Sequence, residues 1–343
     1  MPGIADLSLA ATIGVFVASA AAIAFAGARL SGVADKLADR TGMGEVMAGA
    51  LFVGAATSLP GAITSVTTAA QGAPQLAIGN ALGGLTAQTA FVAVADLFYR
   101  RANLEHAAAS ASGLAQGILL VALLSMPLIA AAQPPVTIWG IHPVSILIPV
   151  AYGFGLRLLS QIRAEPMWEP VQTDETREAL SAPDTGDGAA SDRSLWLRFL
   201  LHAGITAAAG WAIGEASLGI VDKTPLSESA VGTVFSAVAN SLPELVTAIA
   251  AVRIGAVSLA VGDVIGGNAF EVMFLSAADM VHDGSIYQAM TAEHRTTGLI
   301  AMLMTAVLLL GMVRREKSGF GNIGFESTLV LVLYAGSVVL IFL

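Results

Sequence analysis

The chain has 343 residues, of which 55% are hydrophobic and only 12% are charged. Ordinary soluble proteins carry about 25% charged residues, so this composition excludes most soluble enzymes and disordered scaffolds. The net charge of −9 offers no basic surface for nucleic acid, and the lack of cysteine excludes disulfides and thiolate metal sites. We therefore predict an all-α polytopic membrane protein that is embedded in the lipid bilayer of the cell's inner or plasma membrane.

Apolar segments long enough to cross a bilayer recur along the whole chain. A membrane-spanning helix needs about 20 mostly apolar residues. The segments that meet this criterion are 7–30, 45–70, 75–99, 107–132, 136–158, 195–221, 228–251, 256–280, 296–313 and 325–343. Five prolines from Pro127 to Pro149 leave the boundaries of the fourth and fifth spans open. The sequence predicts about ten transmembrane helices.

The basic residues predict how these helices are oriented. Cytoplasmic flanks of membrane proteins carry an excess of lysine and arginine. If the amino terminus is outside, 14 of the 16 basic residues fall on cytoplasmic flanks, and only Lys223 and Arg295 fall outside. We therefore expect both termini outside and the segment 161–194 in the cytoplasm.

The segment 161–194 is the one long polar stretch, and eight acidic residues lie in it among prolines and glycines. Such a composition is typical of a solvated linker. A regulatory or ion-sensing loop is the alternative, although the spacing of a calcium-binding loop is missing. This segment divides the chain into halves of 1–160 and 195–343.

An internal repeat relates the two halves. Residues 52–96 align with residues 235–279 without a gap, at an offset of 183 residues. The matched pairs include Ser58/Ser241, Pro60/Pro243, Gly79/Gly262, Gly83/Gly266, Gly84/Gly267 and Asp96/Asp279. Because each half holds five spans, an odd number, the two copies must cross the membrane in opposite directions. Inverted repeats of this kind are typical of secondary transporters, with the site at the bilayer midplane between the copies.

Each copy of the repeat carries helix-breaking residues near mid-membrane. Pro60 and Pro243 each remove one helical hydrogen bond. The glycine clusters at 79–84 and 262–267 permit close helix approach and local unwinding. Two broken helix pairs would present carbonyls, hydroxyls and carboxylates, which are the hard oxygen ligands that suit Ca²⁺ or Na⁺.

Two acidic residues lie midway along predicted spans. Ionisable groups at this depth are energetically costly and usually functional, which favours ion binding by Glu244 and Glu271 over the alternative of protonated core carboxyls. Asp263, nearer a helix start, fits a vestibule or supporting role as well as ligation. Asp96 and Asp279 lie near span ends and are predicted to be structural. Neutral oxygens beside the acids come from Thr57, Ser58, Asn240, Ser241 and Asn268.

The Ser-Leu-Pro-Glu motif at 241–244, followed by a glycine-rich Gly-Asn segment, resembles the α-repeats of the calcium:cation antiporter superfamily, the sodium/calcium and calcium/proton exchangers. The resemblance implies ten helices in two inverted halves and a cytoplasmic loop. It implies Glu244 and Glu271 as acidic ligands, with Asn240 and Ser241 ahead of the first acid. Thr57 and Ser58 match that polar pair in the first copy, and the Gly-Asn-Ala-Phe-Glu segment is most similar to the proton-coupled branch.

The first copy departs from the family pattern. Gly61 stands where the family has glutamate, and Gln88 stands opposite Glu271, so we add Gln88 to the candidate metal site. Two carboxylates can offset one divalent cation, two protons or two monovalent ions without leaving net buried charge. This favours exchange of calcium against protons, or against few sodium ions, over a three-sodium stoichiometry.

The sequence therefore predicts a secondary-active antiporter that exchanges Ca²⁺ for H⁺ or Na⁺ by alternating access. Its expected partners are inorganic cations, and neither enzymatic activity nor a prosthetic group is expected. Two alternatives stay open. One is a transporter of another cation (Na⁺, K⁺, Mg²⁺ or Mn²⁺), and the other is a degenerate, non-transporting membrane scaffold or sensor.

Overall fold

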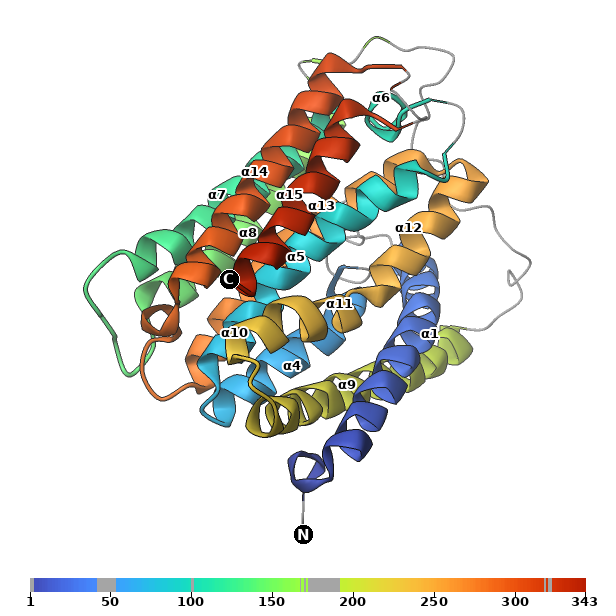
Figure 1. Ribbon diagram of the computed structural model, residues 1–343. Helices are drawn as coiled ribbons and strands as arrows, with labels where there is room; N and C mark the ends of the chain where they lie inside the picture. Colours follow the sequence, from blue (N-terminus) through green and yellow to red (C-terminus); the bar gives the residue numbers. More distant parts are fainter. Residues whose placement is uncertain are drawn as a thin grey trace.

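The structure, a computed structural model, describes residues 3–41, 54–99, 102–166, 168–169, 171, 192–317, 319 and 323–343. Within these residues every regular element is helical. Figure 1 shows α1 and α9 side by side along one flank of a helical bundle, and α7, α8 and α14 on the opposite flank, with α5 and α13 between them.

The helices of the first half are η1 Ile4–Asp6, α1 Leu9–Thr41, α3 Ala55–Thr57, α4 Leu59–Ala70, α5 Pro74–Asp96, α6 Leu104–Ala107, α7 Ala111–Ala131 and α8 Pro143–Ala164. Those of the second half are α9 Asp192–Lys223, α10 Glu228–Ala230, the π-helical η3 Val231–Ser236, α11 Ala237–Asn240, α12 Leu242–Ile254, α13 Val257–Val281, η4 Ile286–Ala289, α14 Ala292–Arg314 and α15 Phe325–Ile341.

The described helices are consistent with the ten predicted spans. Seven of them are long and apolar enough to cross a bilayer, namely α1, α5, α7, α8, α9, α13 and α14. The segments Glu228–Asn240 and Leu242–Ile254 form a further span together, bent by 43°. The shorter α15 is also apolar, and α4 completes the predicted span 45–70, whose first residues lie outside the described residues. The protein is therefore an all-α polytopic membrane protein.

Two span boundaries differ from prediction. The first helix continues to Thr41 rather than ending at residue 30. The fifth span begins at Pro143 rather than at 136, because proline fits the first turn of a helix, where its missing N–H is not needed. The residues before it form a turn around Trp139, whose side chain is 98% exposed. The long polar segment is mostly outside the described residues, which omit 172–191.

The internal repeat is visible where residues 183 positions apart touch each other. The side chains of Gln88 and Glu271 are hydrogen-bonded, and the Asn268 amide nitrogen lies 3.5 Å from the carbonyl oxygen of Leu85. Equivalent residues of two symmetry-related units can meet only near the axis that relates the units. The pseudo-twofold axis therefore passes between α5 and α13, the two central helices.

The same symmetry governs how the outer helices pack. On α1, a Cβ at Gly27 would overlap the ring of Pro243 in the second half. On α9, a Cβ at Gly210, the equivalent position, would overlap the backbone of Pro60 in the first half. Each half thus covers the helix break of the other half.

The matched aspartates tie the halves together at the two ends of the bundle. Asp96 accepts hydrogen bonds from the backbone nitrogens of Leu104 (2.8 Å) and Gly324 (3.1 Å). Asp279 accepts from those of Ile286 (2.8 Å) and His142 (2.8 Å). Each carboxylate therefore joins the end of a central helix to its own half and to the last helix of the other half, which confirms their structural role.

The predicted unwinding at the glycine clusters is wrong, because α5 and α13 run unbroken through them. In α5 these glycines serve close approach instead. A Cβ at Gly79 would lie 2.9 Å from the hydroxyl of Thr233, and one at Gly83 would overlap the Thr233 carbonyl oxygen. The π-helical η3 packs directly on this face of α5.

Candidate ion-binding site

Two helix breaks bring polar residues into the middle of the bundle. Ser58 separates α3 from α4, and Ser241 separates α11 from α12. Pro60 and Pro243 lie in the first turn of the new helices, where a missing N–H leaves no hydrogen bond unmade. The predicted interruption is therefore confirmed, and it falls two residues before each proline.

All eight candidate residues are at most 6% exposed, namely Thr57, Ser58, Gln88, Asn240, Ser241, Glu244, Asn268 and Glu271. They come from α3, α5, α11, α12, α13 and the two breaks. Buried polar groups cost free energy unless a hydrogen bond or an ion satisfies them. The partners of each side chain therefore indicate what the site lacks.

The side chain of Glu271 on α13 is held in place by residues of α5. Its Oε1 accepts a hydrogen bond of 2.6 Å from the Gln88 amide nitrogen, which also lies 3.3 Å from the Ser241 hydroxyl. A Cβ at Gly84 would lie only 2.5 Å from Oε2 of Glu271. The glycine therefore makes room for the carboxylate, and Oε2 is left without a hydrogen-bond partner.

Glu244 lies in the first turn of α12 and is 5% exposed. Neither carboxylate oxygen accepts a hydrogen bond of good geometry, although the Thr57 hydroxyl lies beside the carboxyl. Its charge and that of Glu271 act on each other across the interior. Two acids from consecutive helices thus face the same buried region.

The two asparagines are fixed through their amide nitrogens. Asn240 donates to the Thr64 hydroxyl (3.0 Å) and to the Asn80 side-chain oxygen (2.8 Å). Asn268 donates to the Thr89 hydroxyl at 3.0 Å. The side-chain oxygens of both asparagines have no hydrogen-bond partner.

Six of the eight candidate residues have buried side-chain oxygens without a hydrogen-bond partner. They are Ser58 Oγ, Gln88 Oε1, Asn240 Oδ1, Glu244 Oε1 and Oε2, Asn268 Oδ1 and Glu271 Oε2. Unsatisfied buried acceptors are rare in native proteins, and a bound ion or proton is one explanation for them. The described residues contain no group of three or more acidic or histidine side chains arranged around one metal. Any cation here would therefore bind two carboxylates together with neutral oxygens.

Asn80 is a site residue that the sequence reasoning did not select. Its amide nitrogen donates to the Gly61 carbonyl oxygen (3.0 Å) and to the Ser65 hydroxyl (2.8 Å), which ties the first helix break to α5. The available signal was its register, because Asn80 occupies the repeat position of Asp263.

Gly61 stands where the family has glutamate, and the space beside it is occupied by the side chain of another helix. A Cβ at Gly61 would lie 2.8 Å from the ring of Phe274, a buried residue of α13. A glutamate at this position would require the ring to move. Nothing in the sequence spacing connects these two residues, so only the tertiary structure reveals the contact.

Asp263 is half-buried on α13, ahead of Glu271 along the helix. Its charge acts on Glu244 on one side and is influenced by Asp35 of α1 on the other. This acid therefore stands between the buried pair and the end of the bundle where α1 terminates.

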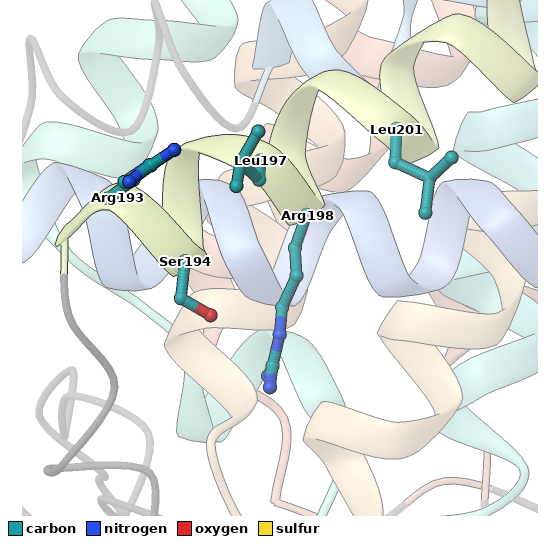
Figure 2. A pocket seen from close by; sticks show the side chains of 5 residues that line it. All are labelled: Arg193, Ser194, Leu197, Arg198 and Leu201. Atoms are coloured by element: carbon teal, nitrogen blue, oxygen red, sulfur yellow. The ribbon is translucent and has the colours of Figure 1, made fainter.

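A hollow of about 390 Å³ lies at the start of α9, lined by Arg193, Ser194, Leu197, Arg198 and Leu201. Figure 2 shows two arginines and no acid among its side chains. Positive charge repels cations, so this hollow is not a candidate cation site.

The comparisons with known proteins agree with this architecture. The sequence profile of the sodium/calcium exchanger protein family matches residues 11–152 and 193–343, so the chain belongs to this family. It is a membrane transporter of the cation-exchanger class and not an enzyme. No curated protein matches the sequence.

Solved structures of exchangers share the fold. The H⁺/Ca²⁺ exchanger CAX has a TM-score of 0.68 and 13% identity, over 96% of this chain and 86% of that chain. The sodium-calcium exchanger NCX_Mj, soaked with 2.5 mM Na⁺ and 0.1 mM Sr²⁺, has a TM-score of 0.63 and 16% identity, over 97% of this chain and 99% of that chain. Identities this low establish the fold and leave ion specificity to the residues of the site.

Proposed function

We propose that the protein exchanges Ca²⁺ for H⁺, or for a small number of Na⁺ ions, by alternating access. Glu244 and Glu271 bind the transported ions, with neutral oxygens from the two helix breaks and from Gln88 and Asn268. The observation that carries this proposal is the pair of buried carboxylates, three of whose four oxygens have no hydrogen-bond partner. Oxygen-rich sites of this type suit hard cations, and Ca²⁺ takes six to eight oxygen ligands.

Charge balance favours proton coupling. The first copy supplies no carboxylate, because Gly61 is covered by Phe274 and Gln88 is a neutral amide. Two carboxylates neutralise one Ca²⁺, and two protons restore neutrality after Ca²⁺ leaves. Three sodium ions would leave excess positive charge in a buried site, which supports protons over a three-sodium stoichiometry.

The pair of carboxylates can hold either kind of ion through the same atoms. The amide nitrogen of Gln88 occupies only Oε1 of Glu271, so Oε2 stays available to a proton or a cation. Both oxygens of Glu244 are similarly available. Competition for shared oxygens makes binding of one ion exclude the other, which is the requirement for obligatory exchange.

We place the halves 1–160 and 195–343 on either side of the axis, with the segment 161–194 in the cytoplasm and both termini outside. In this orientation Asp35 and Asp263 lie on the cytoplasmic side of the site. Their charges attract cations toward Glu244.

Ion flux in proteoliposomes tests the proposal. We expect Ca²⁺ flux driven by a pH gradient in the absence of Na⁺. Glu244→Gln and Glu271→Gln should each weaken Ca²⁺ binding at least tenfold, or about 1.4 kcal/mol, because one charge then faces a divalent ion. Glu215→Gln is the matched control, since this acid lies on α9 beside Gln71 and outside the site.

Three outcomes would contradict parts of the proposal. Strong Na⁺-driven Ca²⁺ flux at clamped pH would overturn proton coupling. Tighter calorimetric binding of Na⁺, Mg²⁺ or Mn²⁺ than of Ca²⁺ would identify another cargo. Cation binding that survives the Glu244→Gln/Glu271→Gln double substitution would show that these residues do not form the binding site. That result would favour a scaffold or sensor.

A further inference from the structure

Three buried carboxyls gather at one end of the bundle, away from the ion-binding site. Asp96 ends α5, Glu105 lies in the short α6, and Glu326 lies in the first turn of α15. Their exposed fractions are 0%, 2% and 3%. Asp96 follows Gln88 along α5 by eight residues, or about 12 Å of helix, so this acid cluster is separate from the ion-binding site.

The hydrogen bonds of the acid cluster are incomplete. Asp96 is satisfied by two backbone nitrogens, and the Ser327 hydroxyl donates a 2.7 Å hydrogen bond to Glu105 Oε1. Glu105 Oε2 is buried and has no partner. A Cβ at Gly324 would lie 2.9 Å from Glu326 Oε2 and 3.3 Å from Glu105 Oε2, so both oxygens lie beside the same backbone atom.

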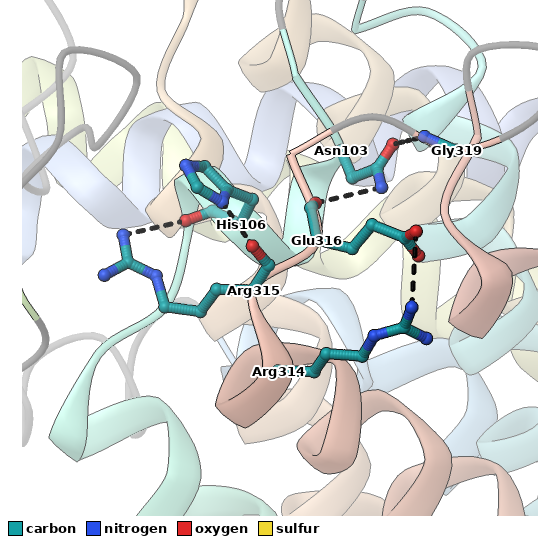
Figure 3. Close-up of polar contacts among 6 residues, drawn as sticks. All are labelled: Asn103, His106, Arg314, Arg315, Glu316 and Gly319. Atoms are coloured by element: carbon teal, nitrogen blue, oxygen red, sulfur yellow. Dashed lines mark hydrogen bonds and ion pairs between the residues drawn. The ribbon is translucent and has the colours of Figure 1, made fainter.

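Within the described part of the chain, no positive side chain forms an ion pair with the acid cluster. Figure 3 shows that Arg314 pairs with Glu316 at 3.4 Å, while Arg315 donates to the backbone oxygen of His106 at 3.3 Å. The His106 ring nitrogen Nδ1 lies 2.7 Å from the Arg315 carbonyl oxygen. Among the described residues, no ion pair reaches Asp96, Glu105 or Glu326.

The charged groups that face Glu105 come from three packed elements. Asp96 at the end of α5 and Glu326 of α15, both acidic, act on Glu105. His106 follows Glu105 in α6, and its ring contacts the backbone of Arg315, just beyond α14. The helix α13 also packs against α6, and none of its charged side chains acts on Glu105.

The opposite end of the bundle shows that joining the helices needs only one acid. There the Ser145 hydroxyl donates to Asp279 at 2.7 Å and lies 2.7 Å from the Tyr287 hydroxyl. Ser145 is the third residue of α8, as Ser327 is the third residue of α15, and Tyr287 takes the place of Glu105. The two additional acids, Glu105 and Glu326, therefore have no counterpart in the structural role that the aspartates perform.

We propose that Asp96, Glu105 and Glu326 form a second proton-binding site, distinct from the ion-binding site. The described residues supply no counter-ion to these three adjacent buried carboxyls, and like charges so close together disfavour full ionisation, so the cluster retains at least one proton. A proton on Glu105 Oε2 turns an unsatisfied acceptor into a donor that faces Glu326. Loss of this proton in alkaline solution brings like charges together where α5, α6 and α15 meet, and weakens that junction.

The direction of the effect follows from Glu105, which lies outside the membrane-spanning helices. Burial, followed by the charge of Asp96, raises the pKa of Glu105 from 4.5 to about 7. The folded protein therefore binds more protons than the unfolded chain between these pH values. Stability from this group is fully present below about pH 4.5 and is lost as the pH rises through about 7.

Thermal unfolding of the full chain in detergent, from pH 5 to pH 9, tests the proposal. We expect the melting temperature of the wild type to fall by several degrees as the pH rises from about 5 to about 7, and to level off above about pH 7. Glu105→Gln should keep the low-pH melting temperature and lose most of this fall, because glutamine resembles the protonated acid. Tyr287→Phe, the matched control at the opposite end, should leave the pH dependence unchanged.

A second measurement keeps the test independent of folding yield and of the transport site. Difference infrared spectra between pH 6 and pH 8 should show a protonated-carboxyl band that is reduced in Glu105→Gln and retained in Glu244→Gln. Calcium binding of Glu105→Gln at pH 6 should equal that of the wild type. An unchanged pH dependence of melting in Glu105→Gln, or a band lost only in Glu244→Gln, would overturn the proposal.

Discussion

Gly84 and Gly267 occupy equivalent positions in the two repeats and face the pair of residues that meets on the pseudo-twofold axis. A Cβ at Gly84 would lie 2.5 Å from Glu271 Oε2, whereas the nearest described atom to a Cβ at Gly267 is Gln88 Oε1 at 3.6 Å. A side chain at position 84 would therefore collide with the Glu271 carboxylate, whereas one at position 267 would make an ordinary van der Waals contact.

We expect Gly84→Ala to displace the Glu271 carboxylate from its hydrogen bond with Gln88. Ca²⁺ affinity should fall at least tenfold, about 1.4 kcal/mol, with a loss of stability of about 1–3 kcal/mol from overpacking. Gly267→Ala is the control and should bind nearly as the wild type. Calorimetric titration together with melting temperatures separates the two effects, and equal affinities of both variants would contradict this account of Gly84.

At the residue scale, the depth of an acid in an apolar segment identifies it without a structure. Glu244 and Glu271 stand out because burying a carboxyl in hydrocarbon is costly. Their assignment as ligands stays a prediction. The contact of Phe274 with Gly61 and the acid cluster around Glu105 could not be predicted, because both depend on which helices pack together.

The helix breaks are stabilised by helices from the opposite half. Gly210 of α9 packs on the backbone of Pro60, while Gly27 of α1 packs on the ring of Pro243. A backbone atom moves only with its helix, whereas the ring of a proline can still adjust its pucker. The α9 contact is therefore the less adaptable of the two.

We predict that Gly210→Ala destabilises the protein by about 1–3 kcal/mol or more, because the added methyl group forces α9 away from the first helix break. Gly204→Ala is the matched control on the same helix, with no described atom within 4 Å of the new Cβ. That substitution should be neutral or stabilising by up to about 1 kcal/mol, since alanine is the better helix former. Similar melting temperatures for both variants would contradict the packing role of Gly210.

At the element scale, the sequence located the spans and the two helix breaks but misjudged the glycine clusters. Glycine in a helix allows both unwinding and close approach, and composition does not distinguish them. In α5 the approach of η3 over Gly79 and Gly83 decided the question. The π-helical η3 itself has no clear sequence signal.

The absence of cysteine makes the orientation of the whole molecule directly testable. Single cysteines can be introduced at Trp139, in the turn before α8, and at Ser181, in the polar segment. We expect a membrane-impermeant maleimide added to intact cells to label Trp139→Cys and not Ser181→Cys. The reverse pattern, or labelling of both, would contradict the predicted topology, and labelling after membrane permeabilisation controls for reactivity.

The sequence by itself determined the membrane class, the approximate spans and the duplication, and the odd number of spans per half predicts the inversion. These properties follow from local composition and periodicity, which the bilayer constrains one segment at a time. Tertiary structure alone decided which equivalent residues meet on the axis, what fills the space at Gly61 and why three acids converge at one end of α5. Such contacts join residues that are distant in the chain, and they arise from helix packing rather than from any local preference.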